Sequence, residues 1–171
     1  MTLYIKETIS PVASLDICDS ADALRYKVAL DHHLGQVNRL SIRNKNGLEV
    51  ATMERRNKKL QALRYEFSAG GTVTEFIARN ALTLAFVAPA LNWVAKNALP
   101  RLNCTIKQDN ITVATIQRER LPSGSHFVLD VRYPPDELAA VGALLFLVCL
   151  MYLHNQSAMA DVAGSILTTL T

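Results

Sequence analysis

The residues of this 171-residue chain that are best suited to bind a ligand are basic and lie in one short stretch. Arg55, Arg56, Lys58 and Lys59 are nearly contiguous, and Arg64 follows closely. If a strand ends here and a loop reverses the chain, these charges meet on one rim of the fold. Each could then contribute on the order of 1 kcal/mol to binding an anionic membrane surface. These residues are our candidates for contacting phospholipid headgroups.

A plainer interpretation of the same charges is a solvated loop that keeps the protein soluble. Arg118 and Arg120 occupy the equivalent place in a second, similar stretch of the chain. An internal repeat would therefore account for both basic clusters without any binding function.

Residue types that catalyse reactions or hold metals occur here without the spacing that those roles need. His32 and His33 are adjacent, and neighbouring side chains of a strand point to opposite faces, so they would not share a metal ion. The run Ser123–His126 lacks the strand-to-helix context of a hydrolase nucleophile and is typical of a polar hairpin turn. No glycine loop for a phosphate or dinucleotide is present. We expect no catalytic residue, no metal site and no cofactor.

Composition and cysteine usage limit the class of protein. The formal net charge is +3, and charged residues make up 19% of the chain, which is too weak a basic balance to predict a nucleic-acid partner. Cys18, Cys104 and Cys149 form no C-x-x-C pair, which favours free thiols in a reducing compartment. Residues 1–7 alternate between polar and apolar types instead of forming the apolar block of a signal peptide. We expect a cytoplasmic protein.

Alternating apolar residues predict a chain of short strands, since side chains of a strand point to opposite faces with period two. Two stretches match as sequence: SIRNKNGLEVATMERR (residues 41–56) and TIKQDNITVATIQRER (residues 105–120). Their offset of roughly 63 residues exceeds the usual period of solenoids and propellers, about 20 to 50 residues. We therefore predict about twelve strands, six per half, in one closed barrel with an internal two-fold repeat. Closure would also remove exposed sheet edges.

The segment ALTLAFVAPALNWVAKNAL (residues 81–99) allows two interpretations. It could be a helix of several turns or two strands, Leu82–Val87 and Asn92–Asn97. We favour strands, because Pro89 would remove a helical hydrogen bond and clash with the preceding turn.

The uncharged run Leu138–Leu153 is predicted to be a helix. Prolines precede it, and Asp136 and Glu137 favour a helix N-terminus, so we expect the helix at about residues 136–154. The run would span roughly 24 Å, less than the ~30 Å hydrocarbon core of a membrane, and no Lys or Arg follows Arg132 to anchor it. We favour burial inside the barrel over a membrane span. Residues 1–155 would then form the barrel, and residues 156–171 a short amphipathic extension.

Three stretches carry a resemblance to a known family: LYIKE, LSIRNKNGLEVATMERR and IKQDNITVATIQRERLPSGSHFVLDV. With them, residues 1–155 resemble the LURP-one-related family, which shares the Tubby-like fold with Tubby C-terminal domains and phospholipid scramblases. The resemblance implies a closed barrel around a hydrophobic helix. Tubby domains bind phosphoinositide headgroups and scramblases are linked to lipid movement. No phosphate-contacting residue of Tubby domains aligns with a particular position here, and the acidic Ca²⁺-binding segment of scramblases is not seen.

Together these features predict a non-enzymatic binding or scaffold protein, cytoplasmic and peripheral at an anionic membrane or bound to another protein. Its oligomeric state stays open. The alternative is an integral, scramblase-like membrane protein anchored by Leu138–Leu153. An enzyme acting on a small apolar ligand would need a cavity that a filled barrel does not leave.

Overall fold

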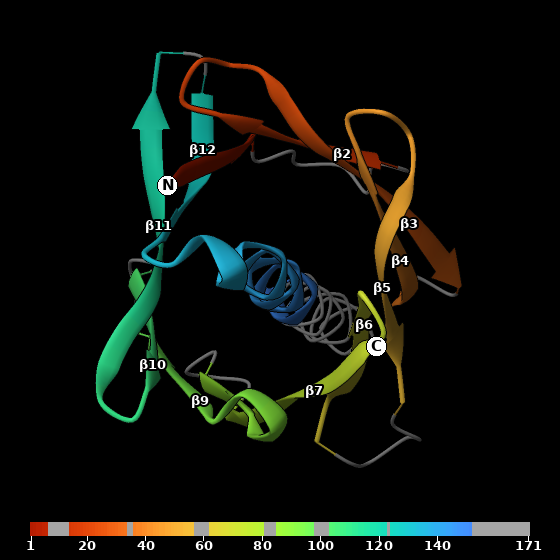
Figure 1. The fold of residues 1–171 in the computed structure, drawn as a ribbon, viewed down its shortest axis with the longest axis vertical. Helices are drawn as coiled ribbons and strands as arrows, with labels where there is room; N and C mark the ends of the chain where they lie inside the picture. The colour runs from red at the N-terminus through yellow and green to blue at the C-terminus, as the bar shows by residue number, and fades with distance from the viewer. Residues whose placement is uncertain are drawn as a thin grey trace, which may run out of the picture.

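The computed structural model describes residues 1–6, 14–33, 36–56, 62–80, 85–97, 103–122 and 124–151. Within them, twelve strands form a closed antiparallel barrel (Figure 1). Each strand pairs with its neighbours in sequence, and β1 closes the barrel against β12. The strands are β1 (Thr2–Lys6), β2 (Ser14–Asp19), β3 (Leu24–His33), β4 (Gln36–Asn44), β5 (Glu49–Arg55), β6 (Arg64–Ala69), β7 (Thr72–Asn80), β8 (Ala85–Ala88), β9 (Trp93–Asn97), β10 (Asn103–Gln108), β11 (Ile111–Leu121) and β12 (Gly124–Val131). The predicted barrel is confirmed.

Residues that alternate along each strand divide between an inner and an outer face. On β2, for example, Leu15 and Ile17 are buried while Asp16 is exposed. The inner faces meet in one core, in which Ile42, Ile106 and Ile116 are fully buried. The period-two pattern of the sequence therefore determines which side chains fill the barrel.

A helix of the same chain lies along the axis of the barrel (Figure 1). The 3-10 turn η2 (Pro134–Asp136) leads into α-helix at residues 137–151, which we call the central helix. Its residues from Ala140 to Leu150 are all buried. In the described ranges, Pro134–Met151 is the one helix long and apolar enough to cross a membrane, and 61% of it is buried inside the protein. The predicted helix is confirmed in this part; its expected end near residue 154 and the extension 156–171 lie outside the described residues.

Aromatic rings fix the central helix against the wall. The ring of Phe146 lies 5.4 Å from that of Phe86 and 5.8 Å from those of Tyr65 and Phe76, measured between centroids. Most of these contacts are edge-to-face, the geometry in which aromatic pairs attract beyond their apolar burial.

The start of the central helix is bound to β3 by polar contacts. Tyr26 Oη donates a hydrogen bond of 2.9 Å to Glu137, and the Arg25 guanidinium lies 3.3 Å from the same carboxylate. The Glu137 side chain is only 13% exposed. A carboxylate so buried needs such partners, since an unpaired buried charge is strongly unfavourable.

The internal repeat is visible in the pairing of the two matching hairpins. In β4–β5, Ile42 pairs with Ala51 and the register shifts after Ile42; in β10–β11, Ile106 pairs with Ala114 and the register shifts after Ile106. The matching sequences thus make the same bulge at the same place, because equivalent residues face inward in both.

The segment around Pro89 forms strands, as predicted. β8 ends at Ala88, the 3-10 turn η1 (Pro89–Leu91) follows, and β9 begins at Trp93. Trp93 is 2% exposed and belongs to the core. Pro89 occupies the first position of the turn, where its missing N–H costs nothing.

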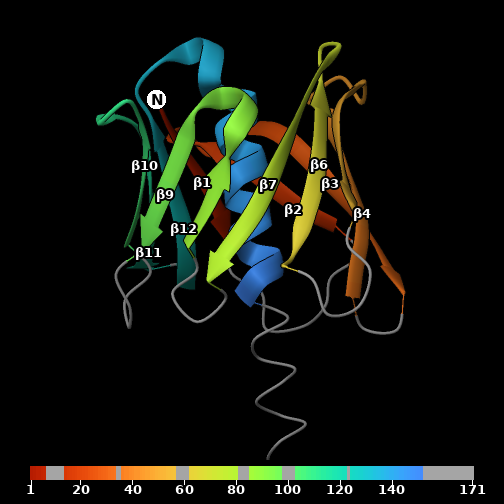
Figure 2. The same cartoon turned by 90° about the horizontal axis from the view of Figure 1, so that it is seen from below.

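The barrel has two different ends (Figure 2). At one, which we call the turn end, the even-numbered strands lead into short turns and η2 begins the central helix. At the other, the loop end, the odd-numbered strands finish and the central helix reaches residue 151. The candidate basic residues of β5 and β6 lie at the loop end.

Candidate functional site

Basic side chains outnumber acidic ones at the loop end, among the described residues. We call the basic set the basic rim: Lys6, Arg39, Arg55, Arg56, Arg64, Arg79, Lys96, Arg118 and Arg120. The acidic residues at the same level are Asp16, Asp31, Glu54, Glu66, Glu75 and Glu119. The rim runs around several strands, because every odd-numbered strand finishes at this end.

The candidate arginines on the outer wall are ion-paired. Arg56 lies 2.7 Å from Glu66 and 3.5 Å from Glu54, and Arg64 lies 3.9 Å from Glu75. The hydrogen bond to Glu66 raises the pKa of Arg56. These carboxylates form one row, because Glu54 pairs with Glu66 across β5–β6 and Glu66 pairs with Glu75 across β6–β7.

Ion pairs of this kind do not lock the arginines in place. Both members of each pair are at least one-third exposed, and exposed pairs contribute only about 0–1 kcal/mol to stability. A phosphate group could therefore take over an arginine from its carboxylate. The glutamate row does, however, cancel part of the positive potential that the sequence suggested.

Arg55 differs from its neighbours because it lies on the inner side of the wall. It pairs with the buried Tyr65 across β5–β6, and its positive charge lowers the pKa of both Tyr65 and Cys149, although burial raises the pKa of both overall. Tyr65 Oη donates a hydrogen bond to the carbonyl oxygen of Val37. Arg55 thus brings a charge to the inner edge of the loop-end mouth, beside the central helix. Lys58 and Lys59 lie outside the described residues.

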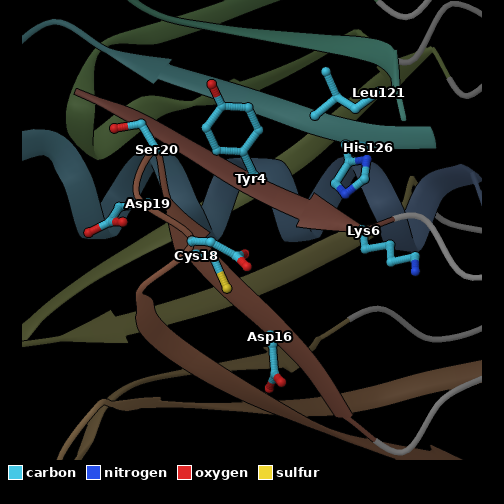
Figure 3. A pocket seen from close by; sticks show the side chains of 9 residues that line it. Tyr4, Lys6, Asp16, Cys18, Asp19, Ser20, Leu121 and His126 are labelled. Atoms are coloured by element: carbon cyan, nitrogen blue, oxygen red, sulfur yellow. The ribbon is translucent and has the colours of Figure 1, made fainter. Parts of the chain in front are cut away.

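A groove on the outer wall joins the two ends of the barrel (Figure 3). It has a volume of about 580 Å³. Lys6 and His126 lie side by side at its loop end, and Asp19 and Ser20 lie at its turn end (Figure 3). Cys18 is between them. Asp19 and Asp22 make the turn end of the groove negative, whereas at its loop end the positive charge of Lys6 lies at the same level as the carboxylate of Asp16.

The groove residues suit binding better than nucleophilic catalysis. Partial burial and then the charges of Asp22, Asp16 and Asp19 raise the pKa of the Cys18 thiol. Cys18 consequently stays protonated near neutral pH, and the thiol is a poor nucleophile. Lys6 and His126 were not among the candidates from sequence, since only the β1–β12 pairing brings them together.

Gly124, Ser125 and His126 of the run Ser123–His126 are part of the β11–β12 hairpin, which agrees with the predicted hairpin turn. Leu121 pairs with Gly124 across β11–β12, and Gly124 adopts a φ of +118° that favours glycine. His126 Nδ1 lies 2.9 Å from the carbonyl oxygen of Gly124. Ser123 itself is outside the described residues.

In the described part of the chain, the cysteines do not combine with other metal-binding residue types to form a metal site. No group of three His, Cys, Asp or Glu side chains there is placed to hold a metal ion. Cys18, Cys104 and Cys149 are free thiols, of which the last two are buried. Burial raises the pKa of each buried thiol to about 12, so these two act as small core residues.

A closed barrel of twelve antiparallel strands around a helix of the same chain is the architecture of Tubby-like proteins. Residues 1–149 match the sequence profile of the LURP-one-related family, and the chain belongs to this family. A comparison with curated proteins found no match. The chain is similar in structure to the X-ray structure of the Arabidopsis thaliana protein AT5G01750, with a TM-score of 0.50 and 15% sequence identity, covering 84% of this chain and 89% of that chain. At this identity the similarity shows the fold alone.

Proposed function

We propose that this protein is a non-enzymatic binding protein whose basic rim contacts the headgroups of anionic phospholipids. The observation that carries the proposal is the separation of charge along the barrel axis. Basic residues outnumber acidic ones at the loop end, whereas at the turn end Asp19, Asp22, Asp109 and Asp136 lie at the same level as Lys45, Lys107 and Arg132, so the excess of positive charge is at the loop end. A protein with one positive end orients that end toward a negatively charged surface.

The expected strength of binding follows from the rim's size. Basic residues close to an anionic membrane contribute on the order of 1 kcal/mol each, and the effect is screened within about 8–10 Å at physiological salt. Only the basic side chains that reach the membrane surface at the same time contribute to binding. A reversible, salt-sensitive contact at the periphery of a cytoplasmic membrane is therefore expected.

A purely binding role agrees with how the barrel is filled. The central helix occupies the interior, with Ala140–Leu150 buried against the wall. Ligand contacts must then be made at the rims or on the outer wall. These are surfaces suited to recognition of headgroups or partner proteins.

Sedimentation with liposomes tests the proposal. The full chain is mixed with vesicles of phosphatidylcholine alone or with a fraction of phosphatidylserine, at low and high salt. We expect sedimentation only with the anionic vesicles and its loss at high salt. Arg118→Glu with Arg120→Glu should reduce it several-fold. The matched control reverses two charges at the turn end, Lys45→Glu with Lys107→Glu, and should bind as the wild type does.

Binding that is absent, insensitive to salt or equally reduced by both double variants would contradict the proposal. The integral-membrane alternative is separated by alkaline carbonate extraction of cells that express the protein. We expect release into the soluble fraction, because the described central helix is buried in its own barrel. Retention in the membrane would favour anchoring by Leu138–Leu153.

A further inference from the structure

The outer wall of the barrel carries a row of apolar side chains across β7, β8 and β9 (β7 and β9 are at the front of Figure 2). Ile77 pairs with Val87 across β7–β8, and Val87 pairs with Val94 across β8–β9. Phe86 is fully buried on the inner face, so its neighbours Ala85 and Val87 point outward. Directly opposite side chains on one face lie about 4.5–5.5 Å apart, so the row is continuous.

This apolar row stays partly exposed in the described chain. Val94 is 44% exposed, and Ile77 and Val87 are half-buried. A neighbouring row of the outer wall is polar instead, with Glu66 opposite Glu75 across β6–β7. A contiguous apolar surface that is rimmed by polar residues is typical of an interaction site.

Charges on both sides of the row limit what can cover it. Arg64 pairs with Ile77 on the β6 side, and Lys107 pairs with Val94 on the β10 side. Glu75, whose carboxylate lies 3.9 Å from Arg64, offsets part of the charge on the β6 side. A segment that covers the row must therefore be apolar and free of Lys and Arg, since like charges brought together are unfavourable.

The chain itself contains a segment of this kind after the central helix. Residues 156–171 include no Lys or Arg, and Asp161 is their one acidic residue. Their apolar residues recur at intervals of three and four, which places them on one side of a helix: Met159, Val162, Ala163, Ile166, Leu167 and Leu170. An amphipathic helix needs a surface on which to bury its apolar side.

The length of the chain allows this segment to reach the row. The described part of the central helix ends at Met151, at the loop end, and β8 begins with Ala85 at the same end. Twelve strands about 4.8 Å apart and tilted by about 35–45° make a ring with a radius of roughly 12 Å, and a helix packs about 10 Å from its neighbour. Residues 152–158 can extend over roughly 24 Å, which covers this distance.

We propose that residues 159–170 form an amphipathic helix that docks on the outer wall over Ile77, Val87 and Val94. The apolar side of the helix covers the row, and Asp161 lies on the side that faces water. Docking of this segment does not depend on membrane contact by the basic rim.

Hydrogen exchange of the full chain, followed by NMR, tests whether the segment docks. Amides of residues 159–170 should exchange at least about tenfold more slowly than those of a synthetic peptide of residues 156–171, because docking protects them. Val87→Asp places a charge in the row and should restore the exchange rates of the peptide. Ala29→Asp is the matched control and should keep the protection, since Ala29 is exposed on β3, at the opposite side of the barrel.

Variants of the segment itself test the same contact without any change to the barrel. Ile166→Asp with Leu167→Asp should shift the amide signals of the three residues in the row and abolish the protection of the segment. The matched control, Ser165→Asp with Thr168→Asp, adds the same charge on the polar side of the helix and should do neither.

Exchange of the wild-type segment at the rates of the peptide would overturn the proposal, and so would protection that survives Val87→Asp. A dimer in sedimentation equilibrium that Val87→Asp dissociates would also overturn it, because a second copy of the chain would then cover the row.

Discussion

Gly142 of the central helix and Phe67 of β6 are in contact with no room for a side chain between them. A methyl group built on Gly142 would lie 2.7 Å from Cε2 of the Phe67 ring and 2.8 Å from Cδ2. Carbon atoms that are not bonded to each other do not approach so closely. This contact sets how near the central helix lies to the wall.

The substitution Gly142→Ala should therefore destabilise the protein. Alanine is favoured over glycine in a helix by about 1 kcal/mol, but overpacking a core costs roughly 1–3 kcal/mol. We expect a net loss of about 1 kcal/mol or more in the free energy of unfolding, measured with urea. Phe67→Leu should partly rescue it in the double variant. An increase in stability on Gly142→Ala alone would show that the ring moves aside freely.

The carboxylate of Glu137 should contribute to stability through Tyr26. Tyr26→Phe removes the 2.9 Å hydrogen bond to Glu137, and hydrogen bonds to charged groups are worth about 1.5–3 kcal/mol. A double-mutant cycle with Glu137→Gln measures this coupling. Additive effects of the two substitutions would mean that the bond holds the helix start only weakly.

Stability should fall at high pH because of the same tyrosine. Burial, and then the hydrogen bond and charge of Glu137, raise the pKa of Tyr26 from 10.0 to about 12. The folded state thus holds its proton more tightly than the unfolded state. The resulting stability is fully present below pH 10 and is lost as the pH rises toward about 12. Unfolding measured between pH 9 and about 12 should show this loss, and Tyr26→Phe should reduce its slope.

Cys18 should react slowly with thiol reagents at neutral pH. Partial burial and its three aspartate neighbours raise the pKa of its thiol, so little thiolate is present. We expect alkylation slower than that of free cysteine, and several-fold acceleration in Asp22→Asn. Cys104 and Cys149 should react only on unfolding, which mass spectrometry of tryptic peptides would distinguish. Alkylation of Cys18 at the rate of free cysteine would contradict the predicted shift.

The barrel could be predicted because its strands and turns have recognisable local sequence patterns. Asn46-Gly47 marks a turn, Gly47 adopts a φ of +80° there, and the flanking residues alternate. The second hairpin repeats this pattern closely enough to make the same bulge after Ile106. The central helix followed from the composition of residues 138–153 and from the absence of flanking basic residues.

The candidate site was predicted less completely, since it depends on which strands become neighbours. Arg56 pairs with Glu66 on β6, and Arg64 pairs with Glu75 on β7; neither partner can be identified from the sequence before it is known which strands are neighbours. The inner position of Arg55 did have a signal: it lies two residues after Met53, which is fully buried, so both share a face. The outer groove had no such signal in the sequence, because it forms only where β1 pairs with β12.

The filling of the barrel also has a consequence for how the protein is made. The central helix follows β12 in the chain, so the ribosome delivers it after every strand that surrounds it. Until the central helix has been synthesised, the apolar inner surfaces of those strands have no native partner. The barrel also stays open until β12 is available to pair with β1. Nascent chains in this state are prone to aggregate. Folding of this protein can therefore be completed only after the central helix has been synthesised, and the time between synthesis of β12 and docking of the helix is when aggregation competes with folding.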